Sequence, residues 1–339
     1  MTRGLDDPKS APRPLGRIAG HVFFGLVLLA ATAWSETALY VQLTGATRIL
    51  ALAALALALA ASGGLFLRFR QRGAGWAALA LTAAAVGLWY GTIQPRQDRD
   101  WAADVAHGVS PTVSGDSVTL NYVRNFRWKD DQTANAAWET RRYDLGKLSG
   151  IDVLTSVWGN PDIAHLLVSF GFADGQHVVF SVEIRREANE SYSVLGGFFR
   201  QFEMVLIAAD EADIIKLRTN YRNEDVHLYP MNLTKAQMRA LFLSYVELGV
   251  SLAREPAFYN TITANCTSTV YRLAKVVTPD LPIDMRLLKS GQLPEYLDEL
   301  GALKGAVPMS ERRRASAITA LARAAPAGVD FSRAIRPLP

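Results

Sequence analysis

Three long apolar segments stand near the start of the chain. They cover residues 18–34, 49–67 and 74–93, and the second and third contain no charged residue. Each approaches the ~20 residues that an α-helix needs to cross a bilayer. Basic residues precede the first segment, as in a signal peptide, but two further apolar segments favour an anchor. We therefore expect three transmembrane helices, the first of them cut short by Ser35 and Glu36.

Arginine and lysine predict the orientation of these helices. Four basic residues lie in the tail 1–17 and three in the loop 68–73, whereas the loop after the first segment offers only Glu36 and Arg48. Positive charge marks the cytoplasmic side, so the tail and the 68–73 loop are expected there. Three spans place the rest of the chain on the far side. We thus expect a multi-pass protein of a bacterial inner membrane, with its C-terminal domain in the periplasm.

The rest of the chain mixes strand and helix patterns. Runs of β-branched and aromatic residues predict strands, at 117–126, 138–143, 151–158, 164–170, 177–184, 202–208 and 226–229. Helical spacing predicts helices at 210–217, 234–254 and 266–277. The expected organisation is a tail (1–17), a membrane anchor (18–93), a linker (94–116), an α+β domain (117–300) and a helical, basic C-terminal extension (301–339).

Composition excludes several classes of function. The chain has 339 residues, a net charge of +4 and one cysteine, so it contains no internal disulfide. Its sequence has no Gly-rich phosphate loop, no CxxC or HExxH metal motif and no nucleic-acid-binding module. We expect neither a metal nor another cofactor, and no nucleic-acid partner.

Cys266 lies where a polar loop gives way to a helical pattern. Val270, Leu273 and Val277 follow at helical spacing, and Asn265 is a good N-cap residue. In the first turn of a helix, the dipole and the free N–H groups favour the thiolate, which is the nucleophilic form of cysteine. Cys266 is therefore either a catalytic thiol or a buried, inert cysteine. Asn265 either caps the helix or helps to form an oxyanion hole.

A nucleophilic thiol usually needs a histidine base that a third group orients. If the turn between the strands 164–170 and 177–184 centres near residue 174, His165 and Glu183 face each other, with Cβ atoms about 5 Å apart. A carboxylate in that place raises the basicity of the imidazole. We predict His165 as base and Glu183 as its orienting group. The other histidines are poorer candidates: His21, His107, His177 and His227.

Six blocks in the second half of the chain add a separate indication. They are 121–126, 163–172, 181–187, 197–203, 217–222 and 258–267. In this order they resemble the periplasmic domain of the Lnb family of lipoprotein N-acyltransferases. A helix-borne cysteine opposite a sheet-borne histidine is also the arrangement of papain-like thiol enzymes. The histidine precedes the cysteine here, as in circularly permuted members such as the lecithin–retinol acyltransferase-like proteins.

The resemblance implies an α+β, permuted papain-like fold of the NlpC and lecithin–retinol acyltransferase type, with an antiparallel sheet and helices. It implies a thiol acyltransferase in which Cys266 is the nucleophile and His165 the base. The expected reaction moves an acyl chain from a phospholipid through a Cys266 thioester to an amine acceptor, such as the N-terminus of a lipoprotein. A cell-envelope cysteine amidase or peptidase and a non-catalytic envelope scaffold remain as alternatives.

Four residues are expected to contact the substrate: Asn265, Arg200, Arg218 and Tyr259. The arginines at 185, 186, 200 and 218 either bind a phospholipid phosphate, which suits the planar guanidinium, or pair with nearby glutamates. We favour pairing for most of them. The basic cluster 312–314 either touches anionic lipid or forms a solvated charged face, and we favour the second.

Overall fold

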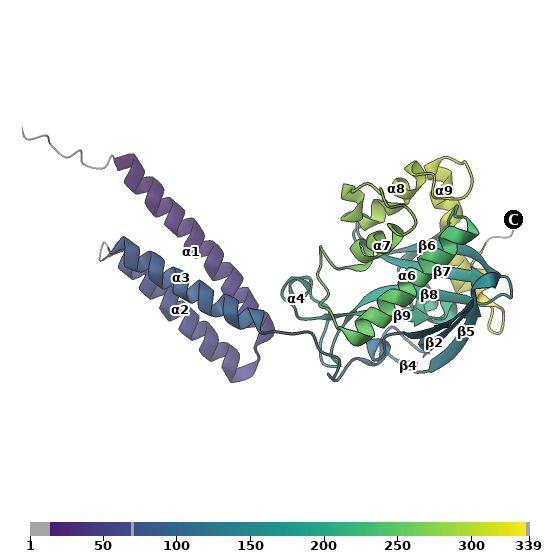
Figure 1. Cartoon of the computed structure of the whole chain (residues 1–339), viewed down its shortest axis with the longest axis horizontal. Coiled ribbons are helices and arrows are strands. Elements are labelled where there is room, and N and C mark those ends of the chain that lie inside the picture. The colour runs from purple at the N-terminus through teal and green to yellow at the C-terminus, as the bar shows by residue number, and fades with distance from the viewer. Residues whose placement is uncertain (1–13, 69–70, 337–339) are drawn as a thin grey trace, which may run out of the picture. The chain divides into compact units, whose positions relative to one another are not determined.

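The computed structural model describes residues 14–68 and 71–336. The chain divides into two compact units, Met1–Gln94 and Pro95–Pro339. Helices alone make up the described part of the first unit, and the second combines a large sheet with helices (Figure 1).

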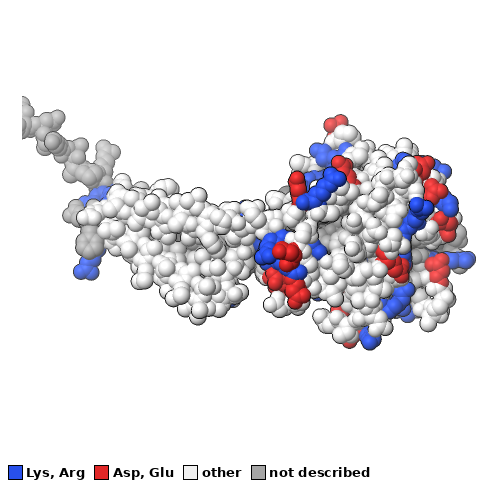
Figure 2. Space-filling model, turned by 60° about the horizontal axis from the view of Figure 1, so that its bottom comes forward, with Lys and Arg blue, Asp and Glu red and all other residues white. Residues whose placement is uncertain are grey.

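The first unit consists of α1 (Pro14–Gln42), α2 (Gly45–Leu67) and α3 (Arg72–Gly91). All three helices are long and apolar enough to cross a membrane. The first continues through Ser35 and Glu36, where we expected it to end, and Ser35 is buried. Between its ends, the visible face of this unit carries almost no charged side chain (Figure 2). Seven basic residues were used to predict the orientation. Those at positions 3, 9, 13 and 70 lie outside the described residues, whereas Arg17, Arg68 and Arg72 lie within them.

Close packing joins these helices. A Cβ atom added at Gly75 of α3 would lie 2.6 Å from the Cβ atom of Phe66 in α2, so only glycine permits this approach. Beside it, the Ser62 hydroxyl donates a hydrogen bond to the Gly75 carbonyl (2.8 Å). The ring of Phe24 in α1 stacks on Phe66 at 3.8 Å between centroids. Small residues and buried hydroxyls at helix crossings are typical of membrane-spanning helices.

The second unit is built on an eight-stranded sheet with the order β1-β2-β9-β8-β7-β6-β10, and β5 also pairs with β2. Neighbouring strands are antiparallel except β2 and β9, which are parallel. The strands β3 (Arg127–Trp128) and β4 (Ala134–Asn135) form a separate ribbon. The strands of the main sheet are β1 (Ser110–Ser114), β2 (Ser117–Arg124), β5 (Trp138–Asp144), β6 (Leu148–Val157), β7 (Ala164–Phe172), β8 (His177–Arg185), β9 (Glu203–Ala209) and β10 (Asp225–Pro230).

Helices cover both faces of the sheet. On one face α6 (Lys235–Arg254), α7 (Cys266–Ala274) and α8 (Leu293–Glu299) pack on the larger core (Figure 1). On the other face α5 (Glu211–Lys216), α10 (Thr319–Ala324) and α11 (Phe331–Ala334) form the smaller core. Both faces of β7 are therefore buried. The shorter elements are α4 (Val194–Phe198), α9 (Met309–Ser316), η1 (Ala103–Val105), η2 (Leu145–Lys147), η3 (Leu217–Tyr221), η4 (Met285–Leu287) and η5 (Ser290–Gln292).

The predicted fold class, α+β with an antiparallel sheet and three preceding apolar helices, is confirmed, and each predicted strand has a counterpart. Two boundaries differ from our expectation. The stretch expected as a linker supplies β1, where Pro111 is tolerated because β1 is an edge strand. The expected C-terminal extension belongs to the same unit as the sheet, because Ile318 and Phe331 complete the smaller core.

Candidate active site

The hairpin of β7 and β8 places the predicted base and its carboxylate. Its register is the one expected from a turn centred on residue 174, since Leu167 pairs with Ser181 and Gly171 with His177. Pairing ends at Leu167 and Ser181, although β7 continues along β6 and β8 along β9. His165 and Glu183 lie just beyond this last pair. The two strands thus present both side chains where their ladder opens.

The N-terminus of α7 places the thiol at the same opening. Asn265 is the N-cap: its Oδ1 accepts the N–H of Ser268 (2.8 Å), and the Ser268 hydroxyl accepts the N–H of Asn265 (2.9 Å). The Asn265 amide nitrogen also donates to the Thr261 carbonyl (2.7 Å). Cys266 is consequently the first residue of the helix, as predicted. There it faces the positive end of the helix dipole.

Cys266, His165 and Glu183 line one cleft of about 760 Å³, within the ~300–1,000 Å³ typical of small-molecule sites. The thiol is half-buried rather than sealed in the core. Helix α7 contacts both β7 and β8, so a segment about a hundred positions downstream meets the hairpin. Cys266 and His165 therefore line the same cleft, and their catalytic roles stay a prediction.

A hydrogen-bonded chain fixes the imidazole. His165 Nε2 lies 2.7 Å from the Ser181 hydroxyl and 3.1 Å from Glu183 Oε1. The Ser181 hydroxyl in turn lies 2.7 Å from the same carboxylate oxygen. Since Nε2 is engaged by this pair, Nδ1 is the ring nitrogen left to face the thiol. A carboxylate that orients the imidazole of a thiol–imidazole pair is the arrangement of cysteine nucleophiles.

Charge at the site favours the thiolate–imidazolium pair. Burial by itself would lower the pKa of His165, but the Glu183 carboxylate outweighs it and raises this pKa to about 9. Burial opposes ionisation of Cys266 as well, yet the adjacent His165 imidazole and the Leu166 backbone lower the pKa of the thiol. The pKa of Glu183 falls well below its usual range despite burial, because His165 and Arg218 stabilise its charge.

A second layer of charges holds Glu183 in place. Arg218 donates to Glu183 Oε1 through Nη2 and to Glu224 Oε2 through Nη1, each at 3.1 Å. Glu224 also accepts a hydrogen bond from the Ser156 hydroxyl. Arg218, Glu224 and Ser156 are all buried. This network explains how the sheet keeps a carboxylate ionised beside the imidazole.

The residues predicted to contact substrate have different surroundings. Tyr259 and Asn265 line the cleft, and burial together with the Cys266 charge raises the pKa of Tyr259. Arg218 also lines it, but two carboxylates engage its guanidinium, as the pairing alternative predicts. Arg200 adopts a positive φ of 58° and lies over the ring of Phe258 rather than among the lining residues. Substrate contact by all four stays a prediction.

The other arginines of interest have structural roles. Arg185 donates to the carbonyls of Val105 (3.1 Å) and Ala106 (2.6 Å), and Arg186 pairs with Asp104 (2.9 Å). In the basic cluster, Arg312 is buried and pairs with Asp298 (3.0 Å). We had expected a solvated face at that cluster; Arg314 is exposed, but Arg312 donates to the carbonyls of Lys304 and Gly305 and so ties α9 to the preceding loop.

Sequence reasoning assigned no role to Ser181 or Arg222, which also belong to the site. Ser181 shares a strand face with Glu183, two residues away, and this alternation was the available signal. Arg222 lines the cleft and is exposed to it. Its guanidinium has no hydrogen bond or ion pair with any residue in 14–68 or 71–336. No sequence pattern distinguishes Arg222 from its paired neighbours.

Donors for an oxyanion are available at α7. The first N–H groups of a helix have no acceptor inside the helix. Asn265 satisfies that of Ser268, while those of Cys266 and Thr267 have no acceptor among the residues that the structure describes. Because the Asn265 side chain is committed to the cap, these two N–H groups are the ones left available to an acceptor.

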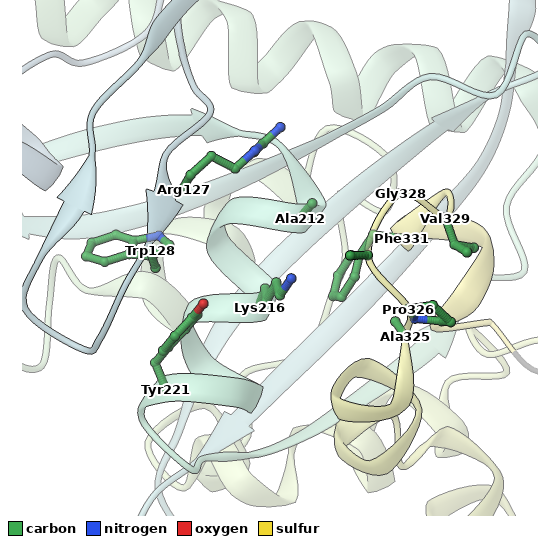
Figure 3. A pocket seen from close by; sticks show the side chains of 11 residues that line it. Arg127, Trp128, Ala212, Lys216, Tyr221, Ala325, Pro326, Gly328, Val329 and Phe331 are labelled. Atoms are coloured by element: carbon green, nitrogen blue, oxygen red, sulfur yellow. The ribbon is translucent and has the colours of Figure 1, made fainter.

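Three other observations give no indication of a second catalytic site. Among the described residues, no group of His, Cys, Asp and Glu could hold a metal ion. A second hollow of about 380 Å³ lies between α5, η3 and the C-terminal segment, with Trp128, Lys216 and Tyr221 opposite Phe331 (Figure 3). It contains no cysteine or histidine, so it lacks a nucleophile–base pair. His227, bound to Asp225 and to the Ser316 hydroxyl, is likewise structural.

These observations define a mixed α+β domain in which a helix-borne cysteine meets a histidine at the opening of a sheet. Residues 134–291 match the family model described as the Lnb N-terminal periplasmic domain. The matched segment includes Cys266, His165 and Glu183. The chain thus resembles the Lnb N-terminal periplasmic domain over this segment, as its sequence blocks indicated. No curated protein and no solved structure matches it significantly. With its three apolar helices, it is a membrane protein with a periplasmic domain.

Proposed function

We propose that the protein is a thiol acyltransferase, held in the bacterial inner membrane by three spans, whose domain works at the periplasmic surface. The observation that carries this proposal is the Cys266–His165–Glu183 arrangement in an open cleft. The lowered pKa of Cys266 favours the thiolate, and the raised pKa of His165 favours the imidazolium, which is a proton donor. Both partners are thus in the form that acyl transfer requires.

The first half-reaction acylates the thiol. The Cys266 thiolate attacks the ester carbonyl of a phospholipid, and the N–H groups of Cys266 and Thr267 bind the oxyanion of the tetrahedral intermediate. The C–O bond to the glycerol oxygen then breaks, and the His165 imidazolium gives its proton to this leaving oxygen. The products are a Cys266 thioester and a lysophospholipid, with His165 neutral.

The second half-reaction transfers the acyl chain. A neutral amine, such as the N-terminus of a lipoprotein, attacks the thioester carbonyl, and His165 takes the proton that the amine loses. The C–S bond breaks and the thiolate leaves. An amide forms, and the thiolate–imidazolium pair is restored. Glu183 stabilises the imidazolium in each half-reaction and does not itself transfer a proton.

The cleft supports a lipid donor over a peptide substrate. Apolar side chains, including Ile163, Ile262 and Leu287, line the cleft together with Cys266. Arg222 adds an exposed guanidinium without a partner among the described residues, in contrast to Arg218 and Arg186. An arginine so placed suits a phosphate, and we assign it to the headgroup of the donor.

The test uses the full chain in phospholipid vesicles with a labelled acyl chain and a diacylglyceryl-cysteinyl peptide as acceptor. The proposal predicts a labelled amide on the peptide, and no labelled amide with Cys266→Ser or His165→Gln. His107→Gln is the matched control and should keep wild-type activity, because His107 lies outside the cleft. Release of free fatty acid without amide would show a hydrolase instead, and cleavage of the peptide would favour an amidase.

A further inference from the structure

Exposed apolar side chains surround the mouth of the cleft. Six of them, which we call the rim, are between 42 and 60 % exposed: Trp158, Ile163, Tyr192, Leu195, Ile262 and Leu288. All but Leu195 line the cleft that contains Cys266. Single exposed apolar residues are normal on a soluble surface, but their concentration around one opening marks an interaction site.

Local contacts fix the rim on both sides of the mouth. On one side, α4 packs on the loop before α7, since the Thr261 hydroxyl donates to the Val194 carbonyl (3.1 Å) and a Cβ at Gly197 would lie 2.3 Å from Thr261 Oγ1. This contact holds Leu195 beside Ile262. On the other side, the Ser290 hydroxyl donates to the Ala164 carbonyl (2.7 Å).

Leu288 lies two residues before Ser290, and Ile163 directly precedes Ala164. The hydrogen bond between Ser290 and Ala164 therefore brings the segments of Leu288 and Ile163 together. Packing of η5 on β7 agrees with this placement. Five of the six rim residues thus line one cleft, and two hydrogen bonds link the segments that carry them. Both sides of the rim are held by side-chain and backbone contacts in the folded domain.

The position at which the chain enters the domain indicates what covers the rim. The Arg96 backbone N–H donates to Glu203 Oε1 (2.9 Å). Glu203 begins β9, shortly after the end of α4 at Phe198. The chain therefore enters the domain at the edge that bears one side of the rim.

The tether itself is short. The apolar helix α3 ends at Gly91, and an extended chain from there to Arg96 reaches about 17 Å. The link between the apolar helix and the first hydrogen bond of the domain is therefore only a few residues long.

The chemistry of the rim fits a bilayer surface. Trp158 and Tyr192 combine an apolar ring with a polar group, the combination that is enriched at membrane–water interfaces. Isoleucine and leucine gain free energy on entering the acyl region. We propose that the rim inserts into the outer surface of the inner membrane, so that a lipid reaches Cys266 without passing through water.

The test exploits the single cysteine of the chain. In a Cys266→Ser background, Leu195→Cys and Leu288→Cys each carry an environment-sensitive fluorophore, and the full chain is placed in nanodiscs containing spin-labelled phospholipid. Val329→Cys is the matched control, because Val329 is 51 % exposed but lines the other hollow. We expect both rim labels to be quenched at least about twofold more strongly than the control, as for side chains in the interfacial layer.

The proposal is overturned if either rim label is quenched no more strongly than the label at Val329. The readout needs no catalysis, so it stands apart from the proposed acyl transfer. A second measurement uses the chain with Cys266 intact. Leu195→Glu should lower transfer from vesicle lipid about tenfold and leave alkylation of Cys266 by iodoacetamide unchanged. A wild-type transfer rate in Leu195→Glu would contradict insertion. A loss of alkylation would show that the substitution damages the site, and the quenching measurement would then decide.

Discussion

Removing the charge of Glu183 is the perturbation that separates a working thiol–imidazole pair from a fortuitous one. Glu183→Gln keeps the size of the side chain and an oxygen that accepts from Ser181 and Arg218, at 2.7 and 3.1 Å in the wild type. Arg218 retains Glu224 as partner, so the fold should persist. What disappears is the negative charge 3.1 Å from His165 Nε2.

The size of the effect follows from the imidazole. Despite burial, chiefly Glu183 raises the pKa of His165 from 6.5 to about 9, which corresponds to about 3 kcal/mol in favour of the imidazolium at 1.36 kcal/mol per pKa unit. Without that charge, burial and Arg218 both oppose protonation of His165. The thiolate then loses its cationic partner, and its population near pH 6 should fall by one to two orders of magnitude, or ~10–100-fold.

Alkylation by iodoacetamide measures this population, because the thiolate is the reacting form. At pH 6 we expect Cys266 in Glu183→Gln to react ~10–100-fold more slowly than in the wild type, with an unchanged circular dichroism spectrum. Glu187→Gln is the matched control: Glu187 follows β8, pairs with Arg99 at 2.6 Å and lies outside the cleft. Equal rates for wild type and Glu183→Gln, or an equal loss in the control, would refute the reasoning.

Three further predictions concern other parts of the site. Acyl transfer should fall as the pH rises through about 9, because the His165 imidazolium that protonates the leaving group is lost there; alkylation of Cys266 should not fall, and a parallel decline of both would contradict this assignment. Arg222→Gln should raise KM for the phospholipid about tenfold with little change in kcat, as for one lost charge-assisted hydrogen bond, and an unchanged KM would remove Arg222 from headgroup binding. Asn265→Ala should lower the free energy of unfolding by about 1 kcal/mol, the cost of a lost N-cap, measured by thermal denaturation in detergent, and an unchanged stability would count against the cap.

Short-range patterns carried most of the information about the site. A turn around Asp174 and Gly175 between two alternating runs fixes the register, and the register brings His165 to Glu183. Asn265 before a helical repeat fixes the start of α7 and hence the position of Cys266. In both cases the relevant contacts span a few residues, so local chemistry determines them.

Contacts between distant segments were less accessible. Arg218 and Glu224 become neighbours of Ser156 only when β10 pairs with β6, and no pattern in the sequence gives that strand order. The edge strand β1 was hidden by Pro111, which suggests a loop unless the strand is known to lie at an edge. The role of Ile318 and Phe331 in the smaller core was hidden because their segment is rich in alanine and has few large apolar side chains.

The most direct test of the central claim is a search for the acyl-enzyme itself. The full chain is incubated with vesicles that carry a labelled acyl chain, without an acceptor amine, then quenched in acid and digested for mass spectrometry. Our account predicts the labelled acyl group on the peptide that contains Cys266, released by hydroxylamine and absent from His165→Gln. If an amide product forms on adding the acceptor while Cys266 never carries the label, the thioester mechanism is contradicted.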